Sequence, residues 1–226
     1  MRLFDSHTHH LRRNAIVDID PVELRLHHLP RHYATARPYS ELQPYALRPG
    51  YTYSVGIHPW NCLLATDKDL LMLRAMAAEP GVAAIGETGL DTMRTERTST
   101  QSGLLKVQTQ LLCIHVSLSE ELRKPLILHV VRRFNEIIRL RKELHPSQPW
   151  IIHGFRGKPE LAGELLRHGF YLSYGEKFNP ASVAVTPTSR LLVESDESHM
   201  PLSVIARRLT AARISTETGE FSALDG

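Results

Sequence analysis

The sequence has little cysteine and no long apolar run. Its two cysteines, Cys62 and Cys113, form no C-x-x-C pair, which excludes a disulfide framework and the cysteine-rich pattern of a structural zinc site. We expect two free thiols in a reducing compartment. The first residues contain no apolar segment typical of a secretion signal, and no run approaches the length of a membrane span. These absences favour a cytoplasmic protein that does not contact membranes.

Strong net charge, internal repeats and low-complexity segments are also absent. The formal charge of +3 permits a phosphate-bearing substrate without requiring one. The chain has 226 residues, of which 42% are hydrophobic and 23% charged, so we predict a single globular domain over residues 1–226, and we expect a monomer. Histidine, in contrast, is abundant, with 13 residues, and it is the side chain that most often binds divalent transition metals.

Short apolar runs rich in β-branched and aromatic residues alternate with amphipathic runs along most of the chain. We predict strands over residues 2–9, 15–19, 51–58, 82–86, 125–129, 150–154, 170–175 and 190–196. We predict helices over residues 67–80, 100–114, 134–144, 159–168 and 201–212. Asp67 is the expected N-cap of the first of these helices, Gly169 closes the fourth, and the tail from Ile214 is expected to fray. This alternation predicts an α/β fold with a parallel sheet, and about eight strands indicate a (β/α)8 TIM barrel.

The stretch Asp5-Ser6-His7-Thr8-His9 ends the first predicted strand. Side chains alternate between the two faces of an extended chain, so His7 and His9 share a face with Asp5. Two imidazoles at this spacing can bind a metal ion, but two exposed histidines at a polar strand end give the same pattern. Residues elsewhere in the chain must decide between these interpretations.

Five further reactive residues each follow directly on an apolar run that predicts a strand: His58, Glu87, His129, His153 and Asp196. The carboxyl ends of the strands of a parallel barrel meet at one mouth, so we expect these side chains to lie together with His7 and His9. The alternative, in which each residue only caps its own strand, is easier to accept for one residue than for all. Seven other histidines fall outside this pattern, and we expect surface or packing roles for them: His27, His28, His32, His115, His145, His168 and His199.

These residue types predict a pocket for two divalent metal ions, with Zn, Mg or Mn as the expected ions. Imidazole nitrogen suits zinc or manganese, and carboxylate oxygen extends the choice to magnesium. Two neighbouring cations need an anionic bridge, for which Glu87 is the natural candidate. Metal ions make bound water nucleophilic near neutral pH by lowering its pKa. Asp196 can bind one metal and accept the proton of that water.

The chain resembles the TatD-like metal-dependent hydrolases, part of the wider group of amidohydrolase-type barrels. The matching stretches occur in the family's order: Asp5-Ser6-His7-Thr8-His9, Gly56-Ile57-His58-Pro59-Trp60, Ile85-Gly86-Glu87-Thr88-Gly89-Leu90-Asp91, Leu128-His129-Val130, His153-Gly154-Phe155-Arg156-Gly157 and Glu194-Ser195-Asp196. The resemblance implies a TIM barrel. The segment between His10 and Tyr51 lacks the helix–strand–helix pattern usual in the family, so we expect an abbreviated second βα unit.

The resemblance also implies a set of site residues and a function. One metal ion would be held by His7, His9, Glu87 and Asp196, and the other by Glu87, His129 and His153. His58 would contact a substrate phosphate or the bridging water, which places it with Glu87 and Asp196 among the implied catalytic residues. The implied activity is hydrolysis of ester bonds in nucleic acid, as a 3′ to 5′ exodeoxyribonuclease acting on DNA, with RNA as a second possible substrate. Some relatives remove D-amino acids from tRNA.

Other side chains near the predicted mouth have two interpretations each. Arg132 and Arg156 can bind a substrate phosphate through two hydrogen bonds, although solvated loop arginines fit equally well. Arg132 is preferred over Arg133 because it is closer to the strand end. Asp91 can orient a metal ligand and Asp5 can support one.

Three aromatic residues and one cysteine also have two interpretations each. Trp60, Tyr53 and Tyr174 can stack on a nucleobase or fill the core. Cys62 has no adjacent base in the sequence, which favours packing over a thiolate nucleophile.

Two other functions remain open from the sequence. The first is a barrel hydrolase of small esters, amides or phosphate monoesters, because substrate choice depends on loops that carry little pattern. The second, from a different class, is a catalytically inactive scaffold that binds metal or nucleic acid. The presence of both Glu87 and Asp196 counts against a scaffold, since binding alone needs no general base.

Overall fold

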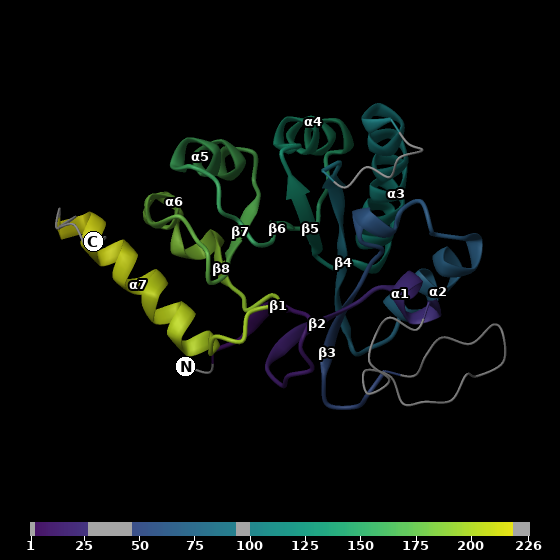
Figure 1. Ribbon diagram of the computed structural model, residues 1–226, viewed down its shortest axis with the longest axis horizontal. Helices are drawn as coiled ribbons and strands as arrows, with labels where there is room; N and C mark the ends of the chain where they lie inside the picture. Colours follow the sequence, from purple (N-terminus) through teal and green to yellow (C-terminus); the bar gives the residue numbers. More distant parts are fainter. Residues whose placement is uncertain (1–2, 27–46, 94–99, 219–226) are drawn as a thin grey trace.

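Eight parallel strands form one sheet in the computed structural model, and the helices surround it (Figure 1). The structure describes residues 3–26, 47–93 and 100–218, with the side chains of the last helix described as far as residue 215. The strands follow one another in chain order, so every neighbour in space is also the next strand in sequence. The strands are β1 (Asp5–Thr8), β2 (Ala15–Ile19), β3 (Thr52–Val55), β4 (Val82–Asp91), β5 (Leu126–Val131), β6 (Trp150–Ile152), β7 (Tyr171–Tyr174) and β8 (Leu191–Val193).

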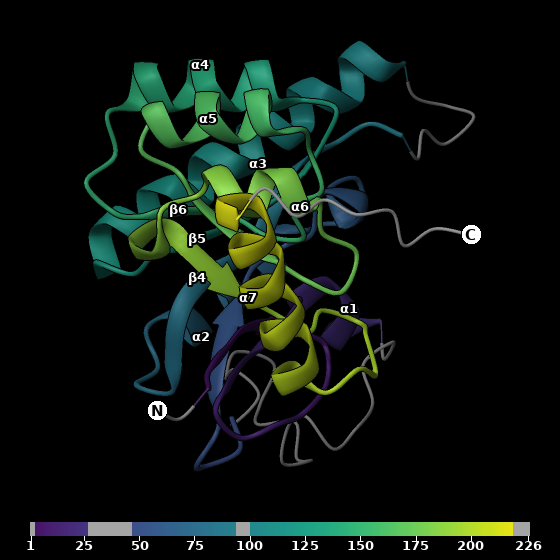
Figure 2. The same ribbon diagram turned by 90° about the vertical axis from the view of Figure 1, so that its left-hand side faces the viewer.

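From β2 onward most helices lie between successive strands, and the last helix follows β8. They are α1 (Pro21–Arg25), η1 (Pro59–Asn61), α2 (Asp67–Ala77), α3 (Gln101–Leu122), α4 (Phe134–Leu144), α5 (Pro159–Arg167), α6 (Pro180–Val185), η2 (Thr188–Arg190) and α7 (Leu202–Thr218). Figure 2 shows α4 and α5 running side by side, with α7 crossing the side of the molecule that faces the viewer. The predicted TIM barrel is confirmed. Within the described residues no helix combines the length and apolarity needed to cross a membrane.

The first and last strands meet through backbone hydrogen bonds around Asp196. The amide of Asp196 donates to the carbonyl of His7 at 3.0 Å, and the amide of His9 donates to the carbonyl of Asp196 at 3.2 Å. A parallel bridge pairs Thr8 with Asp196. The sheet therefore closes at His7, His9 and Asp196, which are among the predicted site residues.

The barrel contains a small apolar layer below the mouth. A small buried cluster consists of Ile16, Ala84, Ile127 and Ile151, each from a different strand. Ile127 and Ile151 lie two residues before His129 and His153, so each pair shares one face of its strand. The apolar layer excludes water below the mouth and limits the movement of the polar side chains above it.

Most predicted elements are present, with corrections at their ends. The strand predicted over residues 82–86 continues to Asp91, so Glu87 lies inside β4 and not after it. The residue at the N-cap of α2 is Thr66, which forms a reciprocal capping box with Asp69, so the prediction of Asp67 was wrong. The last helix extends to Thr218, beyond the point where fraying was expected.

The irregular segment after the second strand is described only in part. It begins with the five-residue helix α1, whose N-cap Asp20 accepts a hydrogen bond from the amide of Val22. The rest of the segment, including His27, His28 and His32, lies outside the described residues.

His115 is a packing residue, as predicted, and it fixes the end of β3. Its side chain is fully buried on α3; Nε2 accepts a hydrogen bond from the amide of Ile57 at 2.9 Å, and Nδ1 donates to the carbonyl of Leu111 at 2.8 Å. The neutral ring thus holds the backbone immediately before His58. Burial lowers the pKa of His115 to about 4, from 6.5, against the raising effect of the Leu111 carbonyl.

This depressed pKa predicts an acid-sensitive stability. As the pH falls below 6.5, the unfolded chain takes up a proton on His115 that the folded chain does not bind until about pH 4. We expect the free energy of unfolding to lose up to about 3 kcal/mol from this residue over that interval. Urea unfolding of the chelator-treated protein between pH 7 and 4 measures the loss. The slope of the free energy of unfolding against pH should be shallower in His115→Gln than in wild type. It should be unchanged in His145→Gln, a control that replaces an exposed histidine. An equal slope in His115→Gln and wild type would contradict the assignment.

Candidate metal centre

Glu87 lies at the centre of the mouth, and its side chain is only 2% exposed. One carboxylate oxygen, Oε1, lies 2.7 Å from His129 Nδ1, 2.7 Å from His153 Nε2 and 3.3 Å from His58 Nε2. His129 lies within β5, His153 directly follows β6, and His58 lies three residues after the end of β3. The barrel therefore brings together side chains that are far apart in the sequence around a single oxygen atom.

The second oxygen of Glu87 faces the histidine pair of the first strand. Oε2 lies 3.3 Å from His7 Nε2 and 3.5 Å from His9 Nε2. Asp196 approaches the same pair from the seam, with Oδ1 3.6 Å from His9 Nε2 and 4.0 Å from His7 Nε2. The carboxylate of Glu87 thus separates two groups of potential ligands, one on each of its oxygens.

The donor atoms fit divalent cations. Both ring nitrogens of His7 are buried without a hydrogen-bond partner among the described residues, an arrangement that is costly unless a bound group satisfies them. Three sets of side chains place their ligand atoms within 4.8 Å of one another and can hold a metal ion: His7 with His9 and Glu87; His58 with Glu87 and His129; and His7 with His153 and Asp196. Imidazole nitrogen and carboxylate oxygen together suit zinc, manganese or a similar ion.

The electrostatics of the pocket also favour a cation. Burial raises the pKa of Glu87, but the charge of His153 and hydrogen bonds from His129, His153 and His58 outweigh it and hold the pKa well below its usual value. Burial lowers the pKa of His9, but Glu87, Asp18 and Asp196 raise it to about 9. The buried carboxylate stays ionised and needs neighbouring positive charge, which protonated imidazoles or bound cations can supply.

Asp91 orients His129, as the sequence suggested. Its Oδ2 lies 3.2 Å from His129 Nε2 and accepts a hydrogen bond from Trp60 Nε1 at 2.7 Å. Burial raises the pKa of Asp91, but hydrogen bonds from His129, Trp60 and the Met93 amide lower it to about 2. An ionised Asp91 on the Nε2 side leaves Nδ1 of His129 directed at Glu87.

Gly89 allows β4 to approach β5 closely beside His129, because its backbone has a φ of +147°. A Cβ atom at this position would lie 2.0 Å from the carbonyl oxygen of His129. Only glycine combines this conformation with so close an approach. The spacing between Glu87 and His129 therefore depends on a residue with no side chain.

Two buried aspartates from the start of the chain support the site, and sequence reasoning missed both. Asp18 Oδ1 accepts hydrogen bonds from the amide of Glu87 at 2.8 Å and from Ser54 Oγ at 3.0 Å. Asp20 Oδ2 accepts from the amide of His58 at 2.9 Å and from Asn61 Nδ2 at 2.8 Å. The signal available in the sequence was a pair of carboxylates two residues apart at the end of the second predicted strand.

Glu194 is a third missed residue. Its side chain is fully buried. Oε1 accepts a hydrogen bond from the amide of Gly154 at 2.7 Å and lies 3.4 Å from His153 Nδ1. Oε2 accepts a hydrogen bond from Ser173 Oγ. A carboxylate on this side favours a proton on Nδ1 of His153, and Nε2 faces Glu87 in the pocket. Its position two residues before Asp196 was the signal in the sequence.

Two cavities open beside Asp196. The larger has a volume of about 640 Å³ and the smaller about 370 Å³, and both are lined by Gly154, Arg156 and Asp196. Arg132 lines the smaller cavity. Arg133, in contrast, donates hydrogen bonds to Thr92 and Glu136. The structure therefore brings Arg132 and Arg156 to the mouth and gives Arg133 other partners.

Of the aromatic residues and the cysteine discussed above, Trp60 lies at the mouth, and the others are buried. Trp60 is 41% exposed and lies edge-on to His58, with ring centroids 4.6 Å apart. Tyr53 and Tyr174 are fully buried core residues, and burial raises the pKa of the Cys62 thiol to about 11, which favours its packing role.

Two side chains near the seam complete the mouth. Asp5 accepts hydrogen bonds from the amide and hydroxyl of Ser195, so its contacts support the barrel closure. His199, which we expected to be unrelated to the site, stacks on His10 and lines the larger cavity.

Comparison with known proteins supports one family. The family model described as TatD related DNase matches residues 4–212. The uncharacterized metal-dependent hydrolase YcfH of Escherichia coli K12 is 35% identical over 162 residues, which cover 68% of this chain and 58% of that protein. The 3′-5′ ssDNA/RNA exonuclease TatD of Cronobacter turicensis is 29% identical over 157 residues, which cover 65% of this chain and 57% of that protein. The matches therefore span less than two thirds of the length of these relatives.

A solved structure shares the fold. The crystal structure of YJJV, a TatD homologue from Escherichia coli K12, aligns with a TM-score of 0.62 at 20% identity and covers 89% of this chain and 77% of its own. At this level of identity the match supports the barrel architecture alone.

Proposed function

Since the chain belongs to the TatD-related DNase family, we propose that it is a divalent-metal-dependent hydrolase that cleaves phosphodiester bonds in nucleic acid. The observation that carries this proposal is Glu87, whose two buried carboxylate oxygens face five imidazoles from four separate strands and the residues that follow them. A relative named as a single-stranded DNA and RNA exonuclease supports nucleic acid as the substrate class.

Two divalent cations would be held by the two groups of ligands that Glu87 separates. His7, His9 and Asp196 lie on the Oε2 side, and His129 and His153 on the Oε1 side. When bound, such ions supply Lewis-acid stabilisation of developing negative charge and lower the pKa of water. We infer Zn, Mn or Mg from the mixture of nitrogen and oxygen donors.

The chain's own residues then have distinct roles. Asp196, at 25% exposure, is the most open carboxylate of the site, so it can accept a proton from an attacking water molecule. His58 is held by the Asp20 carboxylate through its backbone amide, and its ring can contact a non-bridging phosphate oxygen. The apolar layer below the mouth keeps bulk water out of the pocket.

The proposal is tested by assaying purified protein on 3′-labelled and 5′-labelled single-stranded DNA and RNA, after chelation and after adding back Mg²⁺, Mn²⁺ or Zn²⁺. We expect cleavage that requires at least one of these ions and releases mononucleotides from the 3′ end. A parallel panel of chromogenic carboxylic esters and phosphate monoesters separates this activity from a small-ester hydrolase. Metal binding with no turnover of any of these substrates would indicate a scaffold and overturn the proposal.

A further inference from the structure

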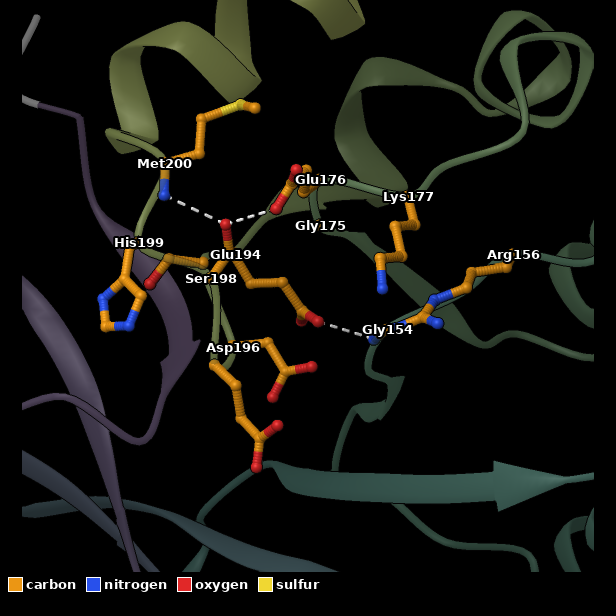
Figure 3. Close-up of a pocket in the computed structure, with 12 residues that line it drawn as sticks. Gly154, Arg156, Gly175, Glu176, Lys177, Glu194, Asp196, Ser198, His199 and Met200 are labelled. Atoms are coloured by element: carbon orange, nitrogen blue, oxygen red, sulfur yellow. Dashed lines mark hydrogen bonds between the residues drawn. The ribbon is translucent and has the colours of Figure 1, made fainter.

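The larger cavity beside Asp196 lies between the loops that follow β6, β7 and β8 (Figure 3). Arg156 comes from the first of these loops and Lys177 from the second, and both line the cavity. Figure 3 shows the two side chains extending toward one another near Gly154. Two cations from separate loops therefore meet next to the proposed metal centre.

Among the described residues, the arginine and lysine ion pairs are those of Arg25, Arg74, Arg133 and Arg139, and none involves Arg156 or Lys177. Like charges that approach each other repel, and an anion between them removes that repulsion. Four carboxylates also line the cavity: Glu176, Glu194, Asp196 and Glu197. Glu176 accepts a hydrogen bond from Ser198 Oγ at 2.5 Å, the buried Glu194 accepts from the Gly154 amide, and Asp196 faces His7 and His9. None of the four, Glu197 included, forms a described ion pair with Arg156 or Lys177. The pair is therefore available to an anion from outside the protein.

The smaller cavity, which Arg156 also lines, has a different character. Its lining includes Val130, Phe134 and Phe155, which suit an uncharged ring better than a phosphate. The two cavities share Gly154, Arg156 and Asp196 in their linings. A ligand that passes Asp196 would thus find an apolar surface in one direction and two cations in the other.

We propose that Arg156 and Lys177 form a binding site for a second phosphate, the one adjacent to the scissile bond. This inference rests on the proposed function and narrows its substrate class. The preferred substrate is a phosphate-linked oligomer with at least one phosphate beyond the bond that is cleaved. An isolated diester or a small ester lacks the group that this site binds.

The kinetic test uses dinucleotides that contain one cleavable diester. The substrates are the unphosphorylated dinucleotide, its 5′-phosphorylated form and its 3′-phosphorylated form, each with the activating metal ion. We expect one of the two terminal phosphates to raise kcat/KM by about 10- to 100-fold, the range expected for charge-assisted hydrogen bonds to a phosphate. Lys177→Gln should reduce that ratio toward one, and Lys177→Arg should restore most of it.

A binding test does not depend on turnover. Fluorescence anisotropy of a labelled single-stranded DNA with the metal-free protein gives Kd as a function of salt. Each lost phosphate contact lowers the slope of log Kd against log salt by about 0.7, so Lys177→Gln and Arg156→Gln should each show that change and the double variant about 1.4. The matched control is Lys106→Gln, an exposed lysine on α3 that lines neither cavity.

The outcomes separate this inference from the proposed function. If wild type cleaves the dinucleotides but neither terminal phosphate raises kcat/KM, the second phosphate site is wrong while the hydrolase proposal stands. If a terminal phosphate raises kcat/KM by the same factor in Lys177→Gln as in Lys106→Gln, Arg156 and Lys177 do not form the phosphate site. If wild type cleaves no dinucleotide and no longer DNA with any metal ion, the proposed function fails, and the anisotropy slopes still decide whether Arg156 and Lys177 bind phosphate.

Discussion

Replacing Glu87 with glutamine is expected to lower both metal affinity and phosphodiesterase kcat/KM by about 10³-fold, since removing one partner from a buried charged network costs roughly 3–5 kcal/mol. The substitution keeps the shape of the side chain and removes the charge that five imidazoles share. Both ligand groups depend on this carboxylate, so both proposed metal ions should be affected. A glutamine side chain also cannot offer two equivalent anionic oxygens, one to each ligand group.

Metal content after dialysis, measured by mass spectrometry, and steady-state kinetics on single-stranded DNA test this expectation together. Circular dichroism of the metal-free variant establishes that it is folded. Glu160→Gln removes an exposed carboxylate from α5 and serves as the control that should retain wild-type metal content. Retention of two tightly bound metal ions by Glu87→Gln would show that Glu87 does not bridge them.

Replacing Asp196 with asparagine is expected to reduce kcat by about 10²- to 10⁴-fold, the range for loss of a general base. The loss of metal should be partial, because only the group containing His7 and His9 contacts this side chain. Asparagine is a suitable replacement because the residue has a φ of +54°, a conformation that aspartate and asparagine both tolerate. The backbone hydrogen bonds that close the barrel at this residue should therefore persist.

A pH profile separates the catalytic role of Asp196 from a purely structural one. The acidic limb of kcat should disappear or move in Asp196→Asn, whereas a destabilised but otherwise normal site would keep its profile at lower amplitude. Unfolding temperature measured in chelator should stay close to wild type. Asp67→Asn, an exposed residue in the first turn of α2, is the charge-matched control. Wild-type kcat in Asp196→Asn would exclude this residue as the base.

The fold could be predicted well from the sequence because its information is local. Runs such as Ala15–Ile19 and Phe134–Leu144 carry the periodicity of a strand and a helix within a few residues, and both elements have the predicted bounds. Regular alternation of such runs leaves few architectures other than a parallel barrel. The errors concern ends, as at Asp91, where pairing with Val131 of β5 extends β4 beyond the local pattern.

The sequence alone determined which reactive residues would meet, and the tertiary structure decided how they are held. Position at the ends of strands was enough to gather His58, Glu87, His129, His153 and Asp196 with His7 and His9, because a parallel barrel has one mouth. The supporting contacts were not accessible in this way. Asp18 holds the amide of Glu87 across 69 positions of the chain and Asp5 holds Ser195 across 190, and such pairings depend on strand register and on closure of the barrel between β1 and β8. The same is true of Arg156 and Lys177, which meet only because consecutive loops fold over one cavity.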